Sequence, residues 1–156
     1  MSSSQRHRRS RRLRTLCAAC QERKARFRYR GEVRADRDHT LCFQFSEYDV
    51  VQPDVLFFGP ARAHLVDLDR AIRHAPDLCV EILSPSTEAT DRGRKMQMFA
   101  RYGVPEYWIV DPVKQTIEVH RLEAGSYLLV QRVGGDDKVE SAVLPGAALR
   151  PRSIFP

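Results

Sequence analysis

Glu81 is an acidic residue within an otherwise apolar run, residues 78–83. A nearly continuous apolar run of this length is typical of a strand that is covered on both faces. A carboxylate in such a strand costs free energy unless it pairs with a cation or binds a metal ion. The alternative is a glutamate near a strand end that reaches solvent or an arginine. Glu81 is therefore the first residue whose type and position indicate chemistry.

Asp54 repeats this pattern in a second apolar segment, residues 50–58. The β-branched residues of this segment predict a strand, and Gly59-Pro60 ends it. Pro53 cannot donate a hydrogen bond to a neighbouring strand, so it indicates a strand start, an edge or a bulge. Asp54 is thus either a second buried carboxylate or a residue of an irregular strand beside this proline.

Lys95 lies on the apolar side of a predicted helix, residues 89–102, which Gly103 closes. With about 100° per residue, the apolar side contains Met96, Met98, Phe99 and Tyr102, and the wet side contains Arg94, Gln97 and Arg101. A lysine in the middle of the apolar side must extend to solvent or meet an anion. Asp91, four residues earlier, offers an ion pair on the helix itself as the alternative to a functional role.

Two carboxylates and a lysine on adjacent core elements suit the hydrolysis of a phosphodiester. The carboxylate oxygens of Asp54 and Glu81 are ligands that Mg²⁺ prefers, and the Ile82 carbonyl is a candidate neutral ligand. A metal ion there would acidify a water molecule and stabilise charge on the phosphate. Lys95 would orient the attacking water or stabilise the transition state. The residues alone therefore favour a nuclease that depends on Mg²⁺ or Mn²⁺.

The neighbouring segments must bring these residues together in one sheet. Strands are expected at 26–33, 40–46, 50–58, 78–83 and 106–110, a hairpin at 116–122 and 126–133, and a last short strand after residues 134–137. A short helix is expected around 67–74, besides the helix at 89–102. Strands interleaved with helices in this order predict a mixed sheet with helices packed on it, an α/β or α+β domain.

The excess positive charge lies in the first quarter of the 156-residue chain, whose net charge is +6. Residues 1–38 contain 13 lysines and arginines against 4 acidic residues, or +9, and residues 39–156 contain 13 against 16, or −3. We expect a basic segment at 1–38, with a disordered arm and a helix over about 11–26, and one domain at 39–156. Such a segment attracts nucleic acid, and a merely solvated arm is the alternative. The candidate contacts are Arg8, Arg9, Arg11, Arg12 and Arg14.

Membrane insertion and secretion are not expected from this sequence. It has no apolar run near the roughly 18 residues that a membrane span needs, and the apolar stretch at 16–20 is too short for a signal peptide. We therefore expect a cytoplasmic protein. Cys17 and Cys20 form a C-x-x-C without a matching second pair, so packing on a helix face is favoured over a zinc site. Cys79 is expected in the core.

The order of the candidate residues resembles the PD-(D/E)XK nuclease superfamily, with Pro53-Asp54 followed by Glu81. Leu83 stands where that motif has its lysine, and Lys95 fits the branches in which the lysine has moved to the following helix. The sequence is more closely similar to the Uma-two family of restriction endonucleases over about residues 46–156. The segments that carry this resemblance are 51–55, 75–78, 80–87, 91–95, 102–112 and 144–146.

This resemblance implies a restriction-endonuclease-like core, here with an added C-terminal β-hairpin, and metal-dependent cleavage of DNA. Asp54, Glu81 and Lys95 would then be catalytic, with the metal ion on Asp54 and Glu81. Asp91 and Tyr102 are the candidates for supporting this site. Because restriction-type nucleases often cut both strands as dimers, a homodimer is also expected.

The N-terminus departs from the family pattern, since an arginine-rich segment stands where an early strand with its glutamate is expected. This departure leaves an alternative function open: a catalytically impaired, N-terminally truncated member that acts as a DNA- or protein-binding module. A hydrolase built around Ser86 is a remote third alternative, because no histidine lies near it in the sequence. Tyr107 and Trp108 could stack on a base, but their apolar strand favours a place in the core.

Overall fold

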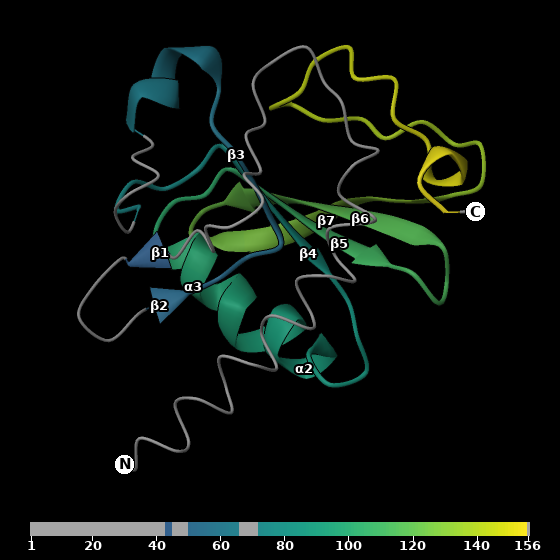
Figure 1. Ribbon diagram of the computed structural model, residues 1–156, viewed down its shortest axis with the longest axis horizontal. Coiled ribbons are helices and arrows are strands. Elements are labelled where there is room, and N and C mark those ends of the chain that lie inside the picture. Colours follow the sequence, from purple (N-terminus) through teal and green to yellow (C-terminus); the bar gives the residue numbers. More distant parts are fainter. Residues whose placement is uncertain (1–42, 45–49, 66–71, 156) are drawn as a thin grey trace, which may run out of the picture.

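The computed structural model describes residues 43–44, 50–65 and 72–155, and its main element is a five-stranded mixed sheet (Figure 1). The strands, in their order across the sheet, are β3 (Val55–Phe57), β4 (Leu78–Ile82), β5 (Glu106–Asp111), β6 (Thr116–Glu123) and β7 (Ser126–Gly134). β4 and β5 are parallel, and the other neighbours are antiparallel. The expected α+β class is confirmed, and so is the C-terminal hairpin, β6–β7.

A helical run connects the two parallel strands, as a parallel pair requires. It consists of α2 (Glu88–Thr90), η2 (Asp91–Lys95) and α3 (Met96–Arg101), and it confirms the helix that was expected over 89–102. Its middle turn, η2, is a π-helix, which the sequence did not indicate; such turns are rare and frequently mark functional sites. Gly103 follows with a φ of 76°, a conformation that glycine adopts readily. In the described ranges, no helix is long and apolar enough to cross a membrane.

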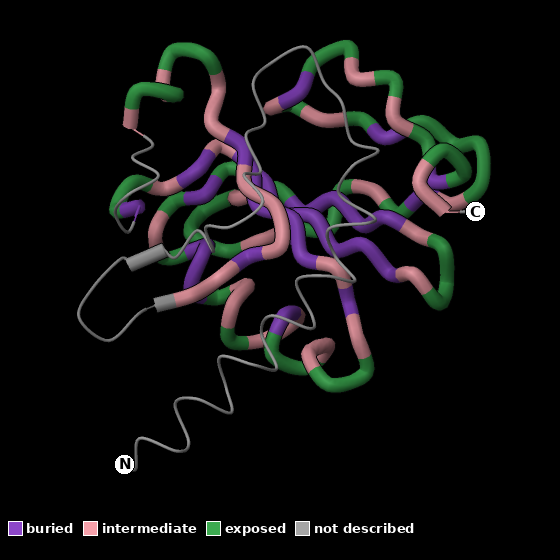
Figure 2. Tube along the Cα trace, in the orientation of Figure 1, coloured by how far each residue is buried: buried purple, intermediate pink, exposed green. Residues whose placement is uncertain are grey.

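Both faces of the sheet are covered. On the helix face, Cys79 and Ile109 pack with Met98 and Phe99 of α3. On the far face, Trp108, Val110, Ile117 and Val119 pack against Val139 and Leu144 of the C-terminal segment. The helical run and the C-terminal segment accordingly lie on opposite sides of the strands in Figure 1, and the buried residues concentrate along the strands between them in Figure 2. This double cover explains why the sequence of β4 is almost continuously apolar.

The prediction of a single strand at 50–58 is wrong, because this segment contains two short strands. β2 (Val50–Val51) pairs with β1 (Phe43–Gln44) in a separate two-stranded sheet, whereas β3 joins the main sheet. The break falls at Gln52 and Pro53, where proline has no N–H to continue a ladder. β1 lies within the strand that was expected at 40–46.

The short helix expected around 67–74 lies mostly outside the described residues, since 66–71 are not described, and a 3₁₀ helix, η1 (Pro60–Leu65), precedes it. One further expectation is wrong in the described part of the chain. The last strand does not form after 134–137. In this segment the backbone forms hydrogen bonds with a side chain instead: Ser141 Oγ accepts from the amides of Val143 and Leu144. A 3₁₀ helix, η3 (Pro151–Ser153), follows. The strand at 26–33, the helix at 11–26 and the C-x-x-C lie outside the described residues.

Candidate active site

Asp54 and Glu81 lie side by side on the helix face of the sheet. Val55 of β3 is in register with Val80 of β4, so Asp54, directly before β3, is beside Glu81. Asp54 Oδ2 accepts a hydrogen bond from the backbone N–H of Ile82 at 2.8 Å. This bond fixes the carboxylate of Asp54 at the carboxyl end of β4, where Glu81 is also located.

Lys95 reaches from η2 to the same place. Its Nζ lies 2.9 Å from Glu81 Oε2 and 2.8 Å from Asp91 Oδ1, and the side chains of both acids are 1% exposed. The sequence left open whether Lys95 meets a catalytic carboxylate or pairs with Asp91 on its own helix. The structure places Lys95 in contact with both Glu81 and Asp91, so the ion pair with Asp91 forms, and a functional role for Lys95 stays a prediction.

One oxygen of Glu81 remains without a partner. Among the described residues, no group forms a hydrogen bond with Glu81 Oε1, although this atom is buried. Burying a polar oxygen without a partner costs on the order of 1–3 kcal/mol. A cation at Oε1 would remove this cost, since carboxylate oxygens bind metal ions readily.

Burial raises the pKa of Glu81 to about 8, and the nearby Asp54 and Asp91 contribute to this increase, whereas Lys95 opposes it. Burial also disfavours the charged form of Lys95, but the neighbouring carboxylates of Glu81 and Asp91 outweigh it and raise the pKa of Lys95. The raised pKa of Glu81 means that a metal ion binding there would compete with a proton. Lys95 keeps its charge near neutral pH.

The donor set fits Mg²⁺ or Mn²⁺ better than zinc. Within the described ranges, no group of three or more histidine, cysteine, aspartate or glutamate residues is arranged to hold a metal ion. Mg²⁺ keeps several water molecules and is commonly bound through one or two carboxylates together with substrate phosphates. Asp54 and Glu81, with the unpartnered Oε1, supply that kind of incomplete oxygen site.

Tyr107 fixes the helical turn that carries Asp91 and Lys95. Its hydroxyl donates a hydrogen bond of 2.9 Å to the backbone carbonyl of Asp91. Its ring is buried between Phe99 and Tyr127, with centroid distances of 5.7 and 5.4 Å. The sequence correctly places Tyr107 in the core, but nothing in it signals this bond, which depends on how η2 meets β5.

Glu118 of β6 is a buried carboxylate that the sequence analysis missed. Arg92 donates to it from η2 at 2.7 Å, Arg132 from β7 at 3.1 Å, and His120 Nε2 lies 3.3 Å away. Burial opposes the charge of Glu118, yet these neighbours, Arg92 foremost, lower its pKa. The missed signal is the period-two pattern of β6, which places Glu118 and His120 on one face of a sheet that is covered on both sides.

The remaining candidates take less central positions. Tyr102 directly follows α3 and packs at the edge of the helix-face cluster. Ser86 is exposed, and its hydroxyl bonds Ser84 Oγ at 3.1 Å in the turn that precedes α2. Cys79 and Trp108 are core residues, as expected. The arginines proposed to contact nucleic acid, residues 8, 9, 11, 12 and 14, lie outside the described part of the chain.

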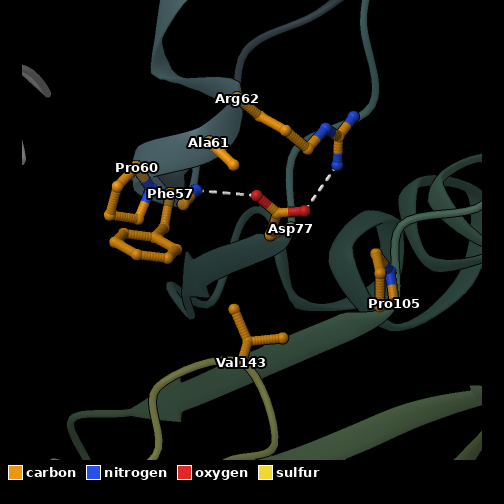
Figure 3. Close-up of a pocket in the computed structure, with 8 residues that line it drawn as sticks. Phe57, Pro60, Ala61, Arg62, Asp77, Pro105 and Val143 are labelled. Atoms are coloured by element: carbon orange, nitrogen blue, oxygen red, sulfur yellow. Dashed lines mark hydrogen bonds and ion pairs between the residues drawn. The ribbon is translucent and has the colours of Figure 1, made fainter.

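A pocket of about 320 Å³ opens at the other end of β4, where the strand begins (Figure 3). Its main polar group is Asp77, whose two oxygens accept hydrogen bonds from the Gly59 N–H and from Arg62. Its other lining residues are Phe57, Pro60, Ala61, Pro105 and Val143. Since Asp77 is already bonded and no nucleophile is among the described residues that line the pocket, the carboxyl end of β4 is the stronger candidate site.

Comparisons with known proteins agree with this fold. The Uma2 family, described as "putative restriction endonuclease", matches residues 1–152. A crystal structure of a "putative nuclease belonging to DUF820" from Anabaena variabilis is similar, with a TM-score of 0.58 and 23% identity. The similarity covers 74% of this chain and 65% of the nuclease, so the chain spans about two thirds of that protein, and at this identity it concerns the fold. No curated protein matches the chain.

Proposed function

The chain belongs to the Uma2 family of putative restriction endonucleases, and we propose that it cleaves DNA as a metal-dependent endonuclease. One observation carries this proposal. Glu81 is buried beside Asp54 with Lys95 on one of its oxygens, while its other oxygen has no partner among the described residues. A cation at this oxygen, beside the fixed ammonium group of Lys95, would supply charge stabilisation that supports phosphodiester hydrolysis.

Each residue has a separate task in this proposal. Asp54 and Glu81 would hold Mg²⁺ or Mn²⁺, and the bound ion would supply acidification of a water molecule and neutralisation of charge on the phosphate. Lys95 donates a hydrogen bond to the attacking water or to a phosphate oxygen, and its raised pKa keeps it protonated. Asp91 holds the Lys95 ammonium group at 2.8 Å and thereby orients it. Tyr102 supports the helix end.

The partner in this proposal is DNA, and the basic segment 1–38 adds affinity for its backbone through electrostatic attraction. Cleavage of both strands would take two copies of the site, so we propose that a homodimer is the active form. The compartment that we propose is the cytoplasm, where a restriction-type enzyme meets DNA.

A non-cleaving member that binds DNA or a protein is the alternative, and the net charge of +9 on residues 1–38 is the observation in its favour. Such a protein would show salt-dependent binding to DNA without metal-dependent cleavage. The binding would weaken when Arg8, Arg9, Arg11, Arg12 and Arg14 are replaced by glutamine.

A nicking assay separates the two functions. Supercoiled plasmid is incubated with Mg²⁺ or Mn²⁺ and the wild type, Glu81→Gln, Lys95→Gln or the control Glu140→Gln, whose side chain is exposed. We expect nicking that needs the metal ion, that falls at least 100-fold in the first two variants and that the control retains. Equal nicking by all four proteins, or none by the wild type with either ion, would refute the proposal.

A further inference from the structure

Glu118 occupies a buried position in the middle of β6, where an apolar residue would have a smaller free-energy cost of burial. The side chain is 5% exposed. Arg92 binds it through both terminal nitrogens, with distances of 2.7 and 3.2 Å. A buried ion pair of this kind often stabilises a fold no better than apolar residues of the same size. The presence of Glu118 therefore suggests that the cations it holds have a task of their own.

Arg132 is the cation in this cluster with unused donors. All three guanidinium nitrogens of Arg92 are engaged, Nε with Glu88 and the terminal pair with Glu118. Arg132 uses Nε alone, on Glu118 at 3.1 Å, and its side chain is 58% exposed. Its terminal nitrogens have no acceptor within the described ranges. Glu118 thus holds the Nε of Arg132 and leaves the two terminal nitrogens of its guanidinium group facing solvent.

The position of the charges in the cluster, rather than their sum, favours an anionic ligand. The two cations, Arg92 and Arg132, are balanced by Glu118, which is buried, and by the half-exposed Glu88, which forms an ion pair with Arg92. Burial lowers the pKa of His120, so this ring is neutral at pH 7 and adds an uncharged neighbour to Glu118. The outermost group is therefore a cation with a planar pair of donors, which matches the geometry of a phosphate.

The register of the sheet places this cluster beside the candidate active site. On neighbouring strands, Glu81 lies opposite Ile109, Ile109 lies opposite Glu118, and Glu118 lies opposite Arg132. Glu81 and Glu118 thus share the helix face two strands apart, about 10 Å at the usual spacing of roughly 4.8 Å per strand. The same turn, η2, supplies Lys95 to Glu81 and Arg92 to Glu118. A DNA strand carries a phosphate about every 3.4 Å along the helix axis, so a phosphate near Lys95 has neighbours within this distance.

We propose that Arg132, anchored by Glu118 and assisted by Arg92, binds a backbone phosphate of DNA next to the phosphate that is cleaved. This inference rests on the proposed function, since it takes DNA as the ligand. Arg132 has a positioning role here: it holds the DNA strand in place while Asp54, Glu81 and Lys95 act on the neighbouring phosphate.

Arg132→Gln tests the inference, with Arg121→Gln as the matched control. Arg121 is an exposed arginine of β6. It lies opposite Glu106 in the strand register and on the far face of the sheet. Affinity for a fluorescein-labelled duplex is measured by anisotropy at several salt concentrations, with Ca²⁺ in place of Mg²⁺, and thermal unfolding verifies that both variants fold. We expect Arg132→Gln to weaken binding about three- to tenfold and to reduce the salt slope by about one. Arg121→Gln should bind as the wild type does.

The nicking assay separates this inference from the proposed function. In a cleaving protein, Arg132→Gln should raise KM and leave kcat within about twofold. The wild type could fail to nick DNA and still bind the duplex with a salt slope that depends on Arg132. This result would refute the proposed cleavage and support the phosphate site. A wild type that nicks, together with an unchanged affinity and slope in Arg132→Gln, would overturn the phosphate site alone. Equal losses in Arg132→Gln and Arg121→Gln would also overturn it.

Discussion

Glu81 and Glu106 are buried glutamates on adjacent strands, yet their environments differ at the level of single oxygens. Glu106 accepts hydrogen bonds from Trp108, from Ser141 and from the Ala142 amide, so both of its oxygens are satisfied, and it ties the C-terminal segment to β5. Glu81 receives Lys95 on one oxygen and has no partner for the other in the described part. The unsatisfied oxygen of Glu81 therefore favours a ligand site there, whereas the fully bonded Glu106 has a structural role.

The stability of the metal-free protein should depend on pH through Glu81. Its pKa is about 8 in the folded protein and near 4.5 when unfolded, so the fold favours the protonated form. The corresponding stabilisation is complete below about pH 4.5 and is lost as pH rises through 8. Relative to Glu81→Gln, the free energy of unfolding of the wild type should therefore fall by about 2 kcal/mol or more between pH 5 and 9.

Urea unfolding in the presence of a chelator measures this difference. Comparing the two proteins at each pH cancels the titrating groups that do not interact with Glu81, which are common to both. A difference in unfolding free energy that stays constant from pH 5 to pH 9 would contradict a raised pKa at Glu81. Mn²⁺ should restore stability to the wild type at pH 9 and have little effect on Glu81→Gln.

At the scale of elements, β4, β5, the β6–β7 hairpin and the helical run were predictable because each has a pronounced apolar pattern. The wheel of the helix also placed Lys95 correctly, since Met98 and Phe99 are buried while Arg94 is exposed. The π turn was not predictable, because local sequence does not determine which carbonyl each amide of η2 selects. The break at Pro53 was predictable as an irregularity, but its consequence, two strands in different sheets, depends on the neighbours that each half meets.

Tyr107→Phe should slow DNA cleavage by disturbing the η2 turn. The substitution removes the hydrogen bond to the Asp91 carbonyl and should cost about 1 kcal/mol of stability. Asp91 and Lys95 are the first and last residues of this turn, so the position of the Lys95 ammonium group should become less defined. We expect nicking to be about fivefold slower or more, while the protein remains folded in thermal unfolding.

Tyr127→Phe is the control for this prediction, since its hydroxyl donates to the Val104 carbonyl, away from η2. It removes the same hydroxyl from a neighbouring, stacked ring and should cost similar stability. Equal nicking rates in Tyr107→Phe and Tyr127→Phe would show that the bond to η2 contributes to stability alone.

At the scale of the whole molecule, the residues that the sequence identified are those that violate a local pattern. Asp54, Glu81 and Lys95 each interrupt an apolar face, and the fold brings them to one place. Glu118 was missed because its partners, Arg92 and Arg132, are 26 and 14 residues away and ordinary in their own segments. Such a network follows from the sheet register and the helix position, neither of which a single sequence specifies.

The basic segment 1–38 should contribute affinity for DNA that does not depend on the base sequence of the duplex. Replacing Arg8, Arg9, Arg11, Arg12 and Arg14 with glutamine removes five of the charges that give this segment a net +9. The dependence of DNA affinity on salt should become shallower by about 0.9 for each phosphate that the segment no longer neutralises. Fluorescence anisotropy with unrelated duplexes measures this change, and an unchanged slope would exclude the segment from the DNA-binding surface.

The most direct test is whether Glu81 forms a metal site by exchanging its proton. Mn²⁺ is titrated calorimetrically at pH 7 into the wild type, Glu81→Gln and Glu140→Gln, in two buffers that differ in ionisation enthalpy. Because the pKa of Glu81 is about 8, wild type and Glu140→Gln should bind Mn²⁺ with release of close to one proton, and Glu81→Gln should lose both the binding and the release. Mn²⁺ binding of equal affinity in Glu81→Gln would contradict the assignment of Glu81 as the metal ligand, and binding to the wild type without proton release would contradict its raised pKa.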